Sequence, residues 1–354
     1  MNTQYLHIKK KSGKPDQEEE TALRRAGEII RSGGLVAFPT ETVYGLGGDA
    51  LNPESSRKIY AAKGRPSDNP LIVHICRFED IYGIVSRLPE AAVKIARAFW
   101  PGPLTMILPK SEPVPPETTG GLDTVAVRFP SHPVARKLIA YGGGYIAAPS
   151  ANLSGRPSPT SAKYVTEDMD GRIDMIIDDG DVGIGLESTI LDLTSDVPRI
   201  LRPGYITRGM LDEVLGKVDI DVTIINPDSG QAPKAPGMKY RHYAPKGKLV
   251  IVEGNPEQVI RYINTHGEAD RQSGEKTGVI ATAEVLEQYH ADVVKCIGSR
   301  EDEEAIARNL FSVLREFDDE HVTSIYSESF PAHGLGQAIM NRLLKAAGHR
   351  IVRL

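Results

Sequence analysis

Polar side chains follow a short apolar run near the start of the chain, and a pair of cations follows soon after. The run Leu35–Phe38 predicts a buried strand, and Thr40–Thr42 places two hydroxyls and a carboxylate directly beyond its end. Ligands of open α/β sheets usually bind where strands end. Further on, Lys63 and Arg65 are separated by one glycine and followed by a proline. Hydroxyls, glycines and paired cations in one stretch are typical of a site for a polyanion beside a small polar molecule.

The segments between these side chains have the signals of the elements that position them. Gly45–Gly48 is rich in glycine, and we expect a flexible loop there that lets the backbone approach a ligand closely. Asn52–Glu54 predicts the start of a helix, since asparagine caps the first turn and proline suits its first position. That helix delivers Lys63 and Arg65, after which Leu71–Ile75 predicts a second buried strand.

Length and pattern predict an α/β protein of two domains. A chain of 354 residues exceeds the usual size of a single core. We expect an N-terminal α/β domain at 1–216, a linker at 217–247 and a smaller C-terminal domain at 248–354. In the last of these, strands and helices alternate, which predicts a Rossmann-like parallel sheet with helices on both faces. The other strands expected are Tyr5–Ile8, Leu104–Leu108, Thr124–Phe129, Ile146–Ser150, Met175–Asp179, Ser188–Leu193, Arg199–Leu201, Leu249–Glu253, Gly278–Ala281, Val293–Ile297 and Ser324–Ser327. The other helices expected are Glu18–Ser32, Pro89–Phe99, His132–Tyr141, Thr207–Leu215, Pro256–Thr265, Ala283–Tyr289, Glu303–Phe317 and Gly336–Ala347.

Charge and composition narrow the class of protein. The net charge of −5 argues against a general nucleic-acid coat protein, although a local basic groove is compatible with it. Cys76 and Cys296 lie far apart, so neither a disulfide framework nor a cysteine zinc site is expected. No apolar run is long enough to span a membrane and the N-terminus lacks a signal-peptide core, so we expect a cytoplasmic protein without membrane contact.

Each candidate side chain also has a structural interpretation. Lys63 and Arg65 are compatible with a solvated helix end favoured by the helix dipole. Arg128 ends an apolar strand and Arg202 precedes a proline, and each is equally compatible with a structural ion pair. A histidine inside an apolar strand, such as His74, more often has a core partner than a ligand. The same structural alternative holds for the serine-rich turn Ser150–Ser158, the carboxylates Glu41 and Glu187, and the linker residues His242 and Tyr243. The sequence shows no catalytic triad, cysteine–histidine pair or metal-ligand cluster, so we expect neither a covalent nucleophile nor a metal held by the protein.

Motifs along the first two thirds of the chain resemble those of one family. PTETVYGLG followed by KGRPSDNPL resembles the YrdC-like family, the threonylcarbamoyl-AMP synthases, in its long two-domain form. The motifs PGPLT, LDTVAVRFP, APSANLSGRPSPT, ESTILDL, LRPG and APGMKYRHYAP follow in the family's order and carry the match as far as Pro245. The resemblance implies that the N-terminal domain is a YrdC-like, twisted open α/β sheet.

The resemblance also implies a reaction. Members of this family condense L-threonine, bicarbonate (or CO2) and ATP to threonylcarbamoyl-AMP and pyrophosphate. That is the first step in the tRNA threonylcarbamoyladenosine modification of the adenosine next to the anticodon. The expected cofactor is Mg2+ accompanying ATP, and the product is expected to pass to the tRNA threonylcarbamoyl transfer machinery, with at most weak contact between this chain and tRNA.

Site residues carry over at the positions that match the family's motifs. The resemblance implies that Lys63 and Arg65 are the catalytic cations. It implies that L-threonine is held by Thr40, His74, Arg128 and Ser188. It implies that ATP is held by Lys63, Arg65, Asn69, Thr124, Ser150, Asn152, Ser158, Arg202, His242 and Tyr243.

The linker and two rival functions complete the expectations. Residues 217–247 are long for a connector and bring aromatic and cationic side chains together, so we expect a lid over the ATP site. A nucleic-acid-binding module is one rival, since a basic groove also holds RNA, but the acidic balance argues against it. The other is a carbamoyltransferase that uses carbamoyl phosphate, as in hydrogenase maturation factors, whose acylphosphatase and zinc-finger segments have no counterpart in this sequence.

Overall fold

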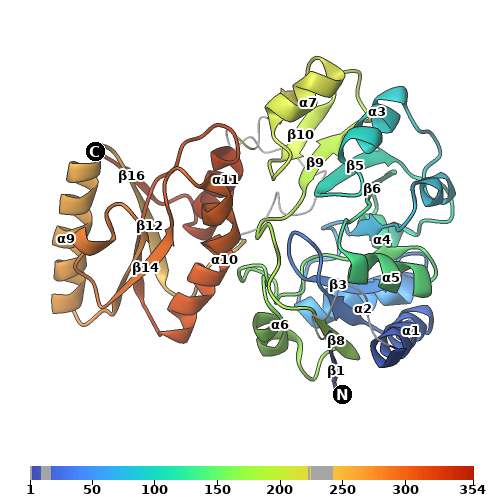
Figure 1. Ribbon diagram of the computed structural model, residues 1–354, viewed down its shortest axis with the longest axis horizontal. Helices are drawn as coiled ribbons and strands as arrows, with labels where there is room; N and C mark the ends of the chain where they lie inside the picture. The colour runs from blue at the N-terminus through green and yellow to red at the C-terminus, as the bar shows by residue number, and fades with distance from the viewer. Residues whose placement is uncertain (1, 9–16, 222–223, 225–241) are drawn as a thin grey trace. The chain divides into compact units, whose positions relative to one another are not determined.

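The structure is a computed structural model that describes residues 2–8, 17–221, 224 and 242–354 (Figure 1). The chain divides into two compact units. The first comprises Met1–Ser154, Pro159–Gly183 and Glu187–Lys239, and the second comprises Gly155–Ser158, Ile184–Leu186 and Tyr240–Leu354. Most of the expected lid, 217–247, lies outside the described residues.

The first unit is built on one mixed sheet. Its eleven described strands lie in the order β1-β8-β2-β3-β7-β4-β6-β5-β9-β10-β11, with both parallel and antiparallel neighbours. The sheet does not close on itself, which confirms the expected open α/β architecture. The strands are β1 (Gln4–His7), β2 (Val36–Phe38), β3 (Gly45–Asp49), β4 (Ile72–His74), β5 (Leu104–Pro109), β6 (Thr124–Arg128), β7 (Ile146–Ala147), β8 (Met175–Asp178), β9 (Thr189–Asp192), β10 (Arg199–Arg202) and β11 (Asp219–Ile220).

Side chains of this sheet alternate between two cores, one on each face. Val36 and Phe38 of β2 enter the core that contains helices α1 and α5, whereas Ala37 between them enters the larger core on the other face. This alternation is what a strand with both faces covered requires. The helices of the unit are α1 (Gln17–Arg31), α2 (Pro53–Lys63), α3 (Glu90–Phe99), α4 (Pro116–Thr119), α5 (Pro133–Tyr141), α6 (Ala162–Met169) and α7 (Arg208–Leu215), together with the 3-10 turn η1 (Phe78–Gly83).

The glycine-rich segment after β2 is a strand, so the expected flexible loop is wrong. Gly45–Asp49 forms β3, which runs antiparallel to β2 and pairs Phe38 with Gly45. A Cβ on Gly47 would lie 2.9 Å from Phe38 Cε1 and 2.8 Å from Ile146 Cγ2. The absent side chain therefore lets the Phe38 ring lie across β3, and glycine serves close packing here rather than mobility.

The second unit is a parallel five-stranded sheet in the order β14-β13-β15-β12-β16, as the sequence predicts. Helix α9 covers one face, while α10 and α11 pack together on the other (Figure 1). The segment expected as the helix Ala283–Tyr289 contains only a 3-10 turn. It connects the adjacent strands β13 and β14, and this short connection has too few residues for a stable helix. The elements are β12 (Lys248–Glu253), α9 (Pro256–Gln272), β13 (Thr277–Thr282), η2 (Leu286–Gln288), β14 (Val293–Gly298), α10 (Glu303–Asp319), β15 (Ser324–Glu328), α11 (Gly336–Ala346) and β16 (Ile351–Arg353).

Candidate active site

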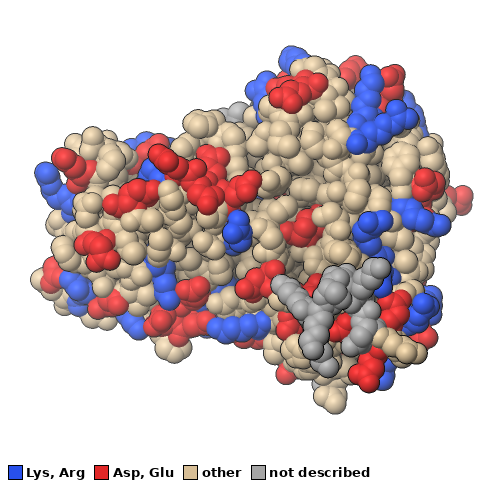
Figure 2. Space-filling model, in the orientation of Figure 1, with Lys and Arg blue, Asp and Glu red and all other residues tan. Residues whose placement is uncertain are grey.

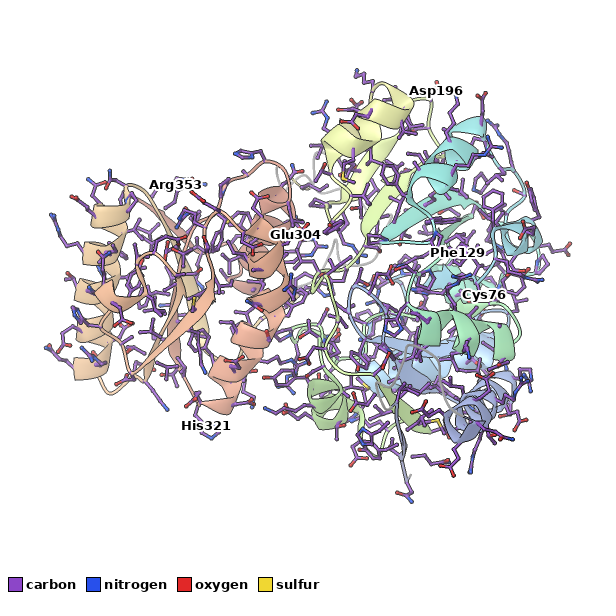
Figure 3. All side chains as sticks on the ribbon, viewed as in Figure 1. Cys76, Phe129, Asp196, Glu304, His321 and Arg353 are labelled. Carbon is purple, nitrogen blue, oxygen red and sulfur yellow. The ribbon has the colours of Figure 1, made fainter. Side chains whose placement is uncertain are left out.

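A buried ion pair joins the end of β6 to the turn after β2. Arg128 Nη2 donates to Glu41 Oε1 at 2.7 Å, and the two side chains are 5% and 14% exposed. Arg128 Nε and Glu41 Oε2 are shielded from solvent and make no hydrogen bond within the described residues. A guanidinium has five donors in a fixed fork, so Arg128 retains donors for a second carboxylate. Phe129, labelled in Figure 3, marks the end of this strand.

His74 stands beside this guanidinium, because β4 and β6 are parallel and His74 is the register partner of Arg128. Its Nδ1 lies 3.0 Å from the carbonyl oxygen of Ile72, and the ring meets Phe38 edge-on with centroids 6.3 Å apart. Burial, together with the positive charge of Arg128, lowers the pKa of His74 to about 3. The imidazole is therefore neutral near pH 7 and offers hydrogen bonding without adding charge.

Thr40 fastens the turn that carries Glu41. Its hydroxyl donates to the Val43 carbonyl oxygen at 2.6 Å and lies 2.8 Å from Thr42 Oγ1. It also accepts from the backbone N–H groups of Thr42 and Val43 at 3.2 and 3.3 Å. Such a side-chain turn fixes backbone direction. Thr40 therefore has a clear role in positioning Glu41, and its contact with a substrate stays a prediction.

Ser188 and Arg202 meet in a second buried cluster. Arg202 donates through Nε to the Ser188 carbonyl oxygen and through Nη2 to Ser188 Oγ, each at 3.1 Å. Thr105, which the sequence did not single out, lies 2.7 Å away, from Oγ1 to Ser188 Oγ. The sequence separates Ser188 and Arg202 into threonine-binding and phosphate-binding roles, whereas the structure brings them into direct contact. Only strand pairing places Thr105 there, so no local motif could have revealed it.

Lys63 is buried, which corrects the interpretation of a solvated helix end. It is 2% exposed, and its ammonium donates to the backbone carbonyl oxygens of Ser150 and Asn152. The helix itself ends as predicted, since Gly64 adopts the left-handed conformation at φ 60° and closes the last turn. Ser150 Oγ in turn donates to Asn152 Oδ1 at 2.5 Å. Three of the residues expected around ATP therefore form one connected group.

Arg65 belongs to a neighbouring turn. It is half-buried and donates through Nε to the Asn69 carbonyl oxygen at 3.2 Å and through Nη2 to the Pro70 carbonyl oxygen at 3.1 Å. These bonds hold the turn that leads into β4. Thr124, also expected at the nucleotide, begins β6 and is half-buried, and within the described residues its side chain makes no hydrogen bond to the other candidates.

Three further candidates fall in the second unit, namely Ser158, His242 and Tyr243. All three are buried, at 1%, 8% and 4% exposure. The Tyr243 ring packs against Phe311 of α10 with centroids 5.0 Å apart, and the Arg342 guanidinium lies 5.9 Å from the centroid of the same ring. Tyr243 thus has apolar and cationic neighbours in this unit, and its proximity to a nucleotide stays a prediction.

The chemistry available is recognition and charge stabilisation. In the part of the chain that the structure describes, no three histidine, cysteine or carboxylate side chains are grouped to hold a metal ion. Within the same residues, no helix is long and apolar enough to cross a membrane. What the first unit offers is a guanidinium with spare donors, a neutral imidazole and a buried ammonium.

Comparisons with known proteins match both units. Residues 28–204 match a family model described as "Telomere recombination", and residues 206–348 match one described as "Threonylcarbamoyl-AMP synthase, C-terminal domain". The threonylcarbamoyl-AMP synthase of Bacillus subtilis is 48% identical over 332 residues, covering 94% of each chain. That of Pyrococcus abyssi is 49% identical over 336 residues, covering 95% of this chain and 97% of the relative. The crystal structure of a P. abyssi protein complexed with L-threonine is 47% identical to this chain with a TM-score of 0.93, covering 99% of this chain and all of that one.

Proposed function

The chain belongs to the threonylcarbamoyl-AMP synthase family, and on that premise we propose that it condenses L-threonine, bicarbonate (or CO2) and ATP to threonylcarbamoyl-AMP and pyrophosphate. The observation that carries the proposal is the identity of nearly half the residues with two such synthases over almost the whole chain. The expected resemblance to this family is thereby confirmed, and a nucleotidyl-transfer reaction follows from it.

Arg128 is suited to the carboxylate of threonine. Its guanidinium is buried, so an ionic hydrogen bond there is stronger than one in water. Glu41 takes one donor and holds the fork in place, while the shielded Nε faces no acceptor within the described residues. A relative of known structure has L-threonine bound, which supports this assignment by analogy. His74 lies beside Arg128, and Ser188 Oγ accepts a hydrogen bond from Arg202. Both side chains would complete the threonine site.

Lys63 and Arg65 are suited to the phosphates of ATP. Lys63 is anchored on the carbonyl groups of Ser150 and Asn152, so its charge is fixed before a substrate arrives. Positioning such a charge in advance avoids reorganisation during the reaction. The side chains offer no dedicated cage for a metal ion in the described part of the chain, so Mg2+ would enter as part of the MgATP substrate and neutralise charge on its phosphates.

The reaction needs no covalent nucleophile from the protein. The threonine amine first attacks the carbon of bicarbonate, with loss of water, or of CO2, with loss of a proton from the amine, to give a carbamate. A carbamate oxygen then attacks the α-phosphorus of ATP, the bond to the bridging oxygen breaks, and pyrophosphate leaves with the electron pair. The role of the protein is to hold the two anions together and stabilise the charge that develops, which is how most phosphoryl-transfer catalysis works.

The product is a mixed anhydride and hence an activated acyl donor. We propose that it passes to the machinery that transfers the threonylcarbamoyl group to the adenosine next to the anticodon of tRNA. In this scheme tRNA is a downstream acceptor, with at most weak contact to this chain, and the net charge of −5 is consistent with that.

Mass spectrometry of the product tests the proposal directly. The full chain incubated with MgATP, L-threonine and bicarbonate should yield threonylcarbamoyl-AMP and an equal amount of pyrophosphate. In buffer freed of bicarbonate and CO2, both products should vanish together. Release of pyrophosphate from ATP and threonine alone would indicate simple aminoacyl adenylation and overturn the proposed order of steps. RNA binding without pyrophosphate release would favour the nucleic-acid-binding alternative.

A further inference from the structure

The sheet of the second unit has a crevice at the ends of two neighbouring strands. β12 and β15 are adjacent and parallel, but their connections leave in opposite directions. From β12 the chain passes through α9 on one face, and from β15 it passes through α11 on the other (Figure 1). Small molecules bind in such crevices of open parallel sheets because diverging loops leave space there. In Figure 3, Arg353 and Glu304 mark the side of the sheet where the carboxyl ends of these strands lie, and His321 lies on the side of their amino ends.

A cavity of about 120 Å³ occupies this crevice. Its apolar wall includes Val252, Val259 and Val285, and its polar wall includes Tyr289, Arg300 and Glu328. If each water-sized centre takes about 15 Å³, the cavity has room for roughly eight non-hydrogen atoms. Nucleotides need pockets of about 300 Å³ or more. The occupant is therefore a small molecule with an apolar part and polar ends.

The polar wall is a charge pair held in place by the backbone. Glu328 is 4% exposed, and its carboxylate accepts from the Thr282 backbone N–H at 2.9 Å and from the Arg300 guanidinium. Arg300 also donates through Nη1 to the Ser329 carbonyl oxygen at 3.1 Å. Because the guanidinium has five donors, it retains some for a second anionic group. A fixed cation and a fixed anion thus stand next to each other at one small cavity.

Tyr289 supplies an independent sign of a missing partner. It is 5% exposed and lines the cavity, and its shielded hydroxyl stands beside the Glu328 carboxylate without reaching full hydrogen-bond geometry with any described residue. Burial and the neighbouring Glu328 carboxylate raise the pKa of Tyr289, so the group stays protonated and able to donate. A buried hydroxyl without a well-aligned partner is destabilising, and native proteins retain few of them. A ligand that accepts from this hydroxyl would remove the cost.

The surroundings favour a ligand that carries both charges. Acidic side chains gather over the end of the second unit's sheet that holds the crevice (Figure 2). The exposed Glu301, Asp302 and Glu304 lie between the end of β14 and the first turn of α10. Their field opposes a phosphate or other polyanion. A bare cation would in turn lie beside Arg300. We propose that this crevice binds a small α-amino acid, with its carboxylate on Arg300 and the Tyr289 hydroxyl and its ammonium on Glu328. A short aliphatic side chain then packs against the valines.

Calorimetry on the full chain with a set of matched probes tests this site. L-Valine carries both charges, isobutyrate carries only the carboxylate, and isobutylamine carries only the ammonium. L-Valine should bind at millimolar concentration, and the two single-charge probes should bind at least about tenfold more weakly, because each lacks the ionic hydrogen bonds to one of the two charged wall groups. Equal binding of all three probes, or no heat from L-valine, would overturn the proposal.

Variants localise the binding to the crevice. Tyr289→Phe should weaken L-valine binding by about two- to tenfold, the range of one hydrogen bond, without lowering the thermal stability of the free protein, because it removes a buried hydroxyl that lacks a well-aligned partner. Arg300→Gln, on a partly exposed side chain, should weaken it more. Tyr262→Phe is the matched control, since Tyr262 lies in the same apolar cluster but does not line the cavity, and its binding should equal that of the wild type. Unchanged binding in Tyr289→Phe and Arg300→Gln, or a crystal structure soaked in L-valine with only ordered water in the crevice, would refute the site.

Discussion

Replacing Lys63 with methionine separates its structural contribution from its proposed role at phosphate. Methionine has nearly the same length and fills nearly the same volume but donates no hydrogen bond. The ammonium of Lys63 donates to the carbonyl oxygens of Ser150 and Asn152, and the side chain is 2% exposed. Each carbonyl group left buried without a donor costs about 1–3 kcal/mol, whereas the desolvation of the ammonium is relieved. We therefore expect Lys63→Met to lower the free energy of unfolding by about 2–4 kcal/mol.

The chain offers a clean probe and a matched control for this measurement. Its single tryptophan, Trp100, lies in the first unit, so tryptophan fluorescence in urea follows the unfolding of the unit that holds Lys63. Arg65→Met is the control, because Arg65 is half-buried whereas Lys63 is almost fully enclosed, although its two carbonyl acceptors belong to the buried Asn69 and Pro70. The control should lose less than Lys63→Met, about 1–2 kcal/mol, since each of its two bonds has a net value of about 0.5–1 kcal/mol.

Activity read in parallel completes the experiment. Both variants should lower turnover by about 100-fold or more, the scale seen when a charge-stabilising group is removed from a preorganised site. If Lys63→Met unfolds at the same urea concentration as the wild type, the buried anchor is not worth what its contacts indicate and the reasoning fails. Full turnover in both variants would instead return the pair to a structural role only.

Three further outcomes follow from the first unit. The pKa of His74 is about 3 in the folded protein and about 6.5 in the unfolded chain, so below pH 6.5 the imidazole is protonated in the unfolded state and stays neutral in the folded state. Stability should therefore fall by about 2 kcal/mol from this group between pH 7 and pH 5, and His74→Gln should lose that part of the fall in urea titrations at each pH. Glu41→Gln leaves Arg128 buried without its counter-charge, so the free energy of unfolding should drop by about 3–5 kcal/mol. L-threonine, whose carboxylate would then supply the missing charge, should raise the melting temperature of the variant more than that of the wild type. Equal threonine-induced shifts would refute the idea that Glu41 and threonine share the Arg128 guanidinium. Gly47→Ala should destabilise by about 1–3 kcal/mol, measured by Trp100 fluorescence, because its Cβ would lie within 3 Å of two side chains, and an unchanged midpoint would mean that the glycine is not required.

Local signals in the sequence were sufficient for the element that delivers the cations. The Asn52 side chain accepts from the Glu54 N–H at 3.0 Å, Pro53 takes the first helical position and Gly64 closes the last turn. Each of these interactions spans at most four residues, so residue type alone encodes it. The same holds for the strands of the second unit, whose alternation with helices predicts a parallel sheet before any contact is known.

Contacts between distant segments were outside the reach of those signals. The burial of Lys63 depends on carbonyl groups from a segment that is remote in sequence, and the pairing of Arg128 with Glu41 depends on how β2, β3, β7 and β4 associate. A glycine-rich segment is compatible with either a loop or a closely packed strand, and only the Phe38 ring decides between them. Register and cross-strand packing are set by tertiary structure, which a single sequence does not display.

The question of whether a cation is structural or functional has the same answer at each predicted position. Lys63 and Arg65 hold backbone carbonyl groups, Arg128 holds Glu41, and Arg202 holds a serine. A long side chain that is free in the unliganded protein would lose rotamer entropy on binding, and its hydration shell would reorganise during the reaction. Lys63, Arg128 and Arg202 have already lost both on folding, because protein acceptors fix them and burial removes water, whereas the half-buried Arg65 is fixed but still meets solvent. The contacts that favour a structural interpretation are therefore also the contacts that would prepare these cations for the anionic substrates that we propose, and a sequence search for uncommitted charges would miss a site of that kind.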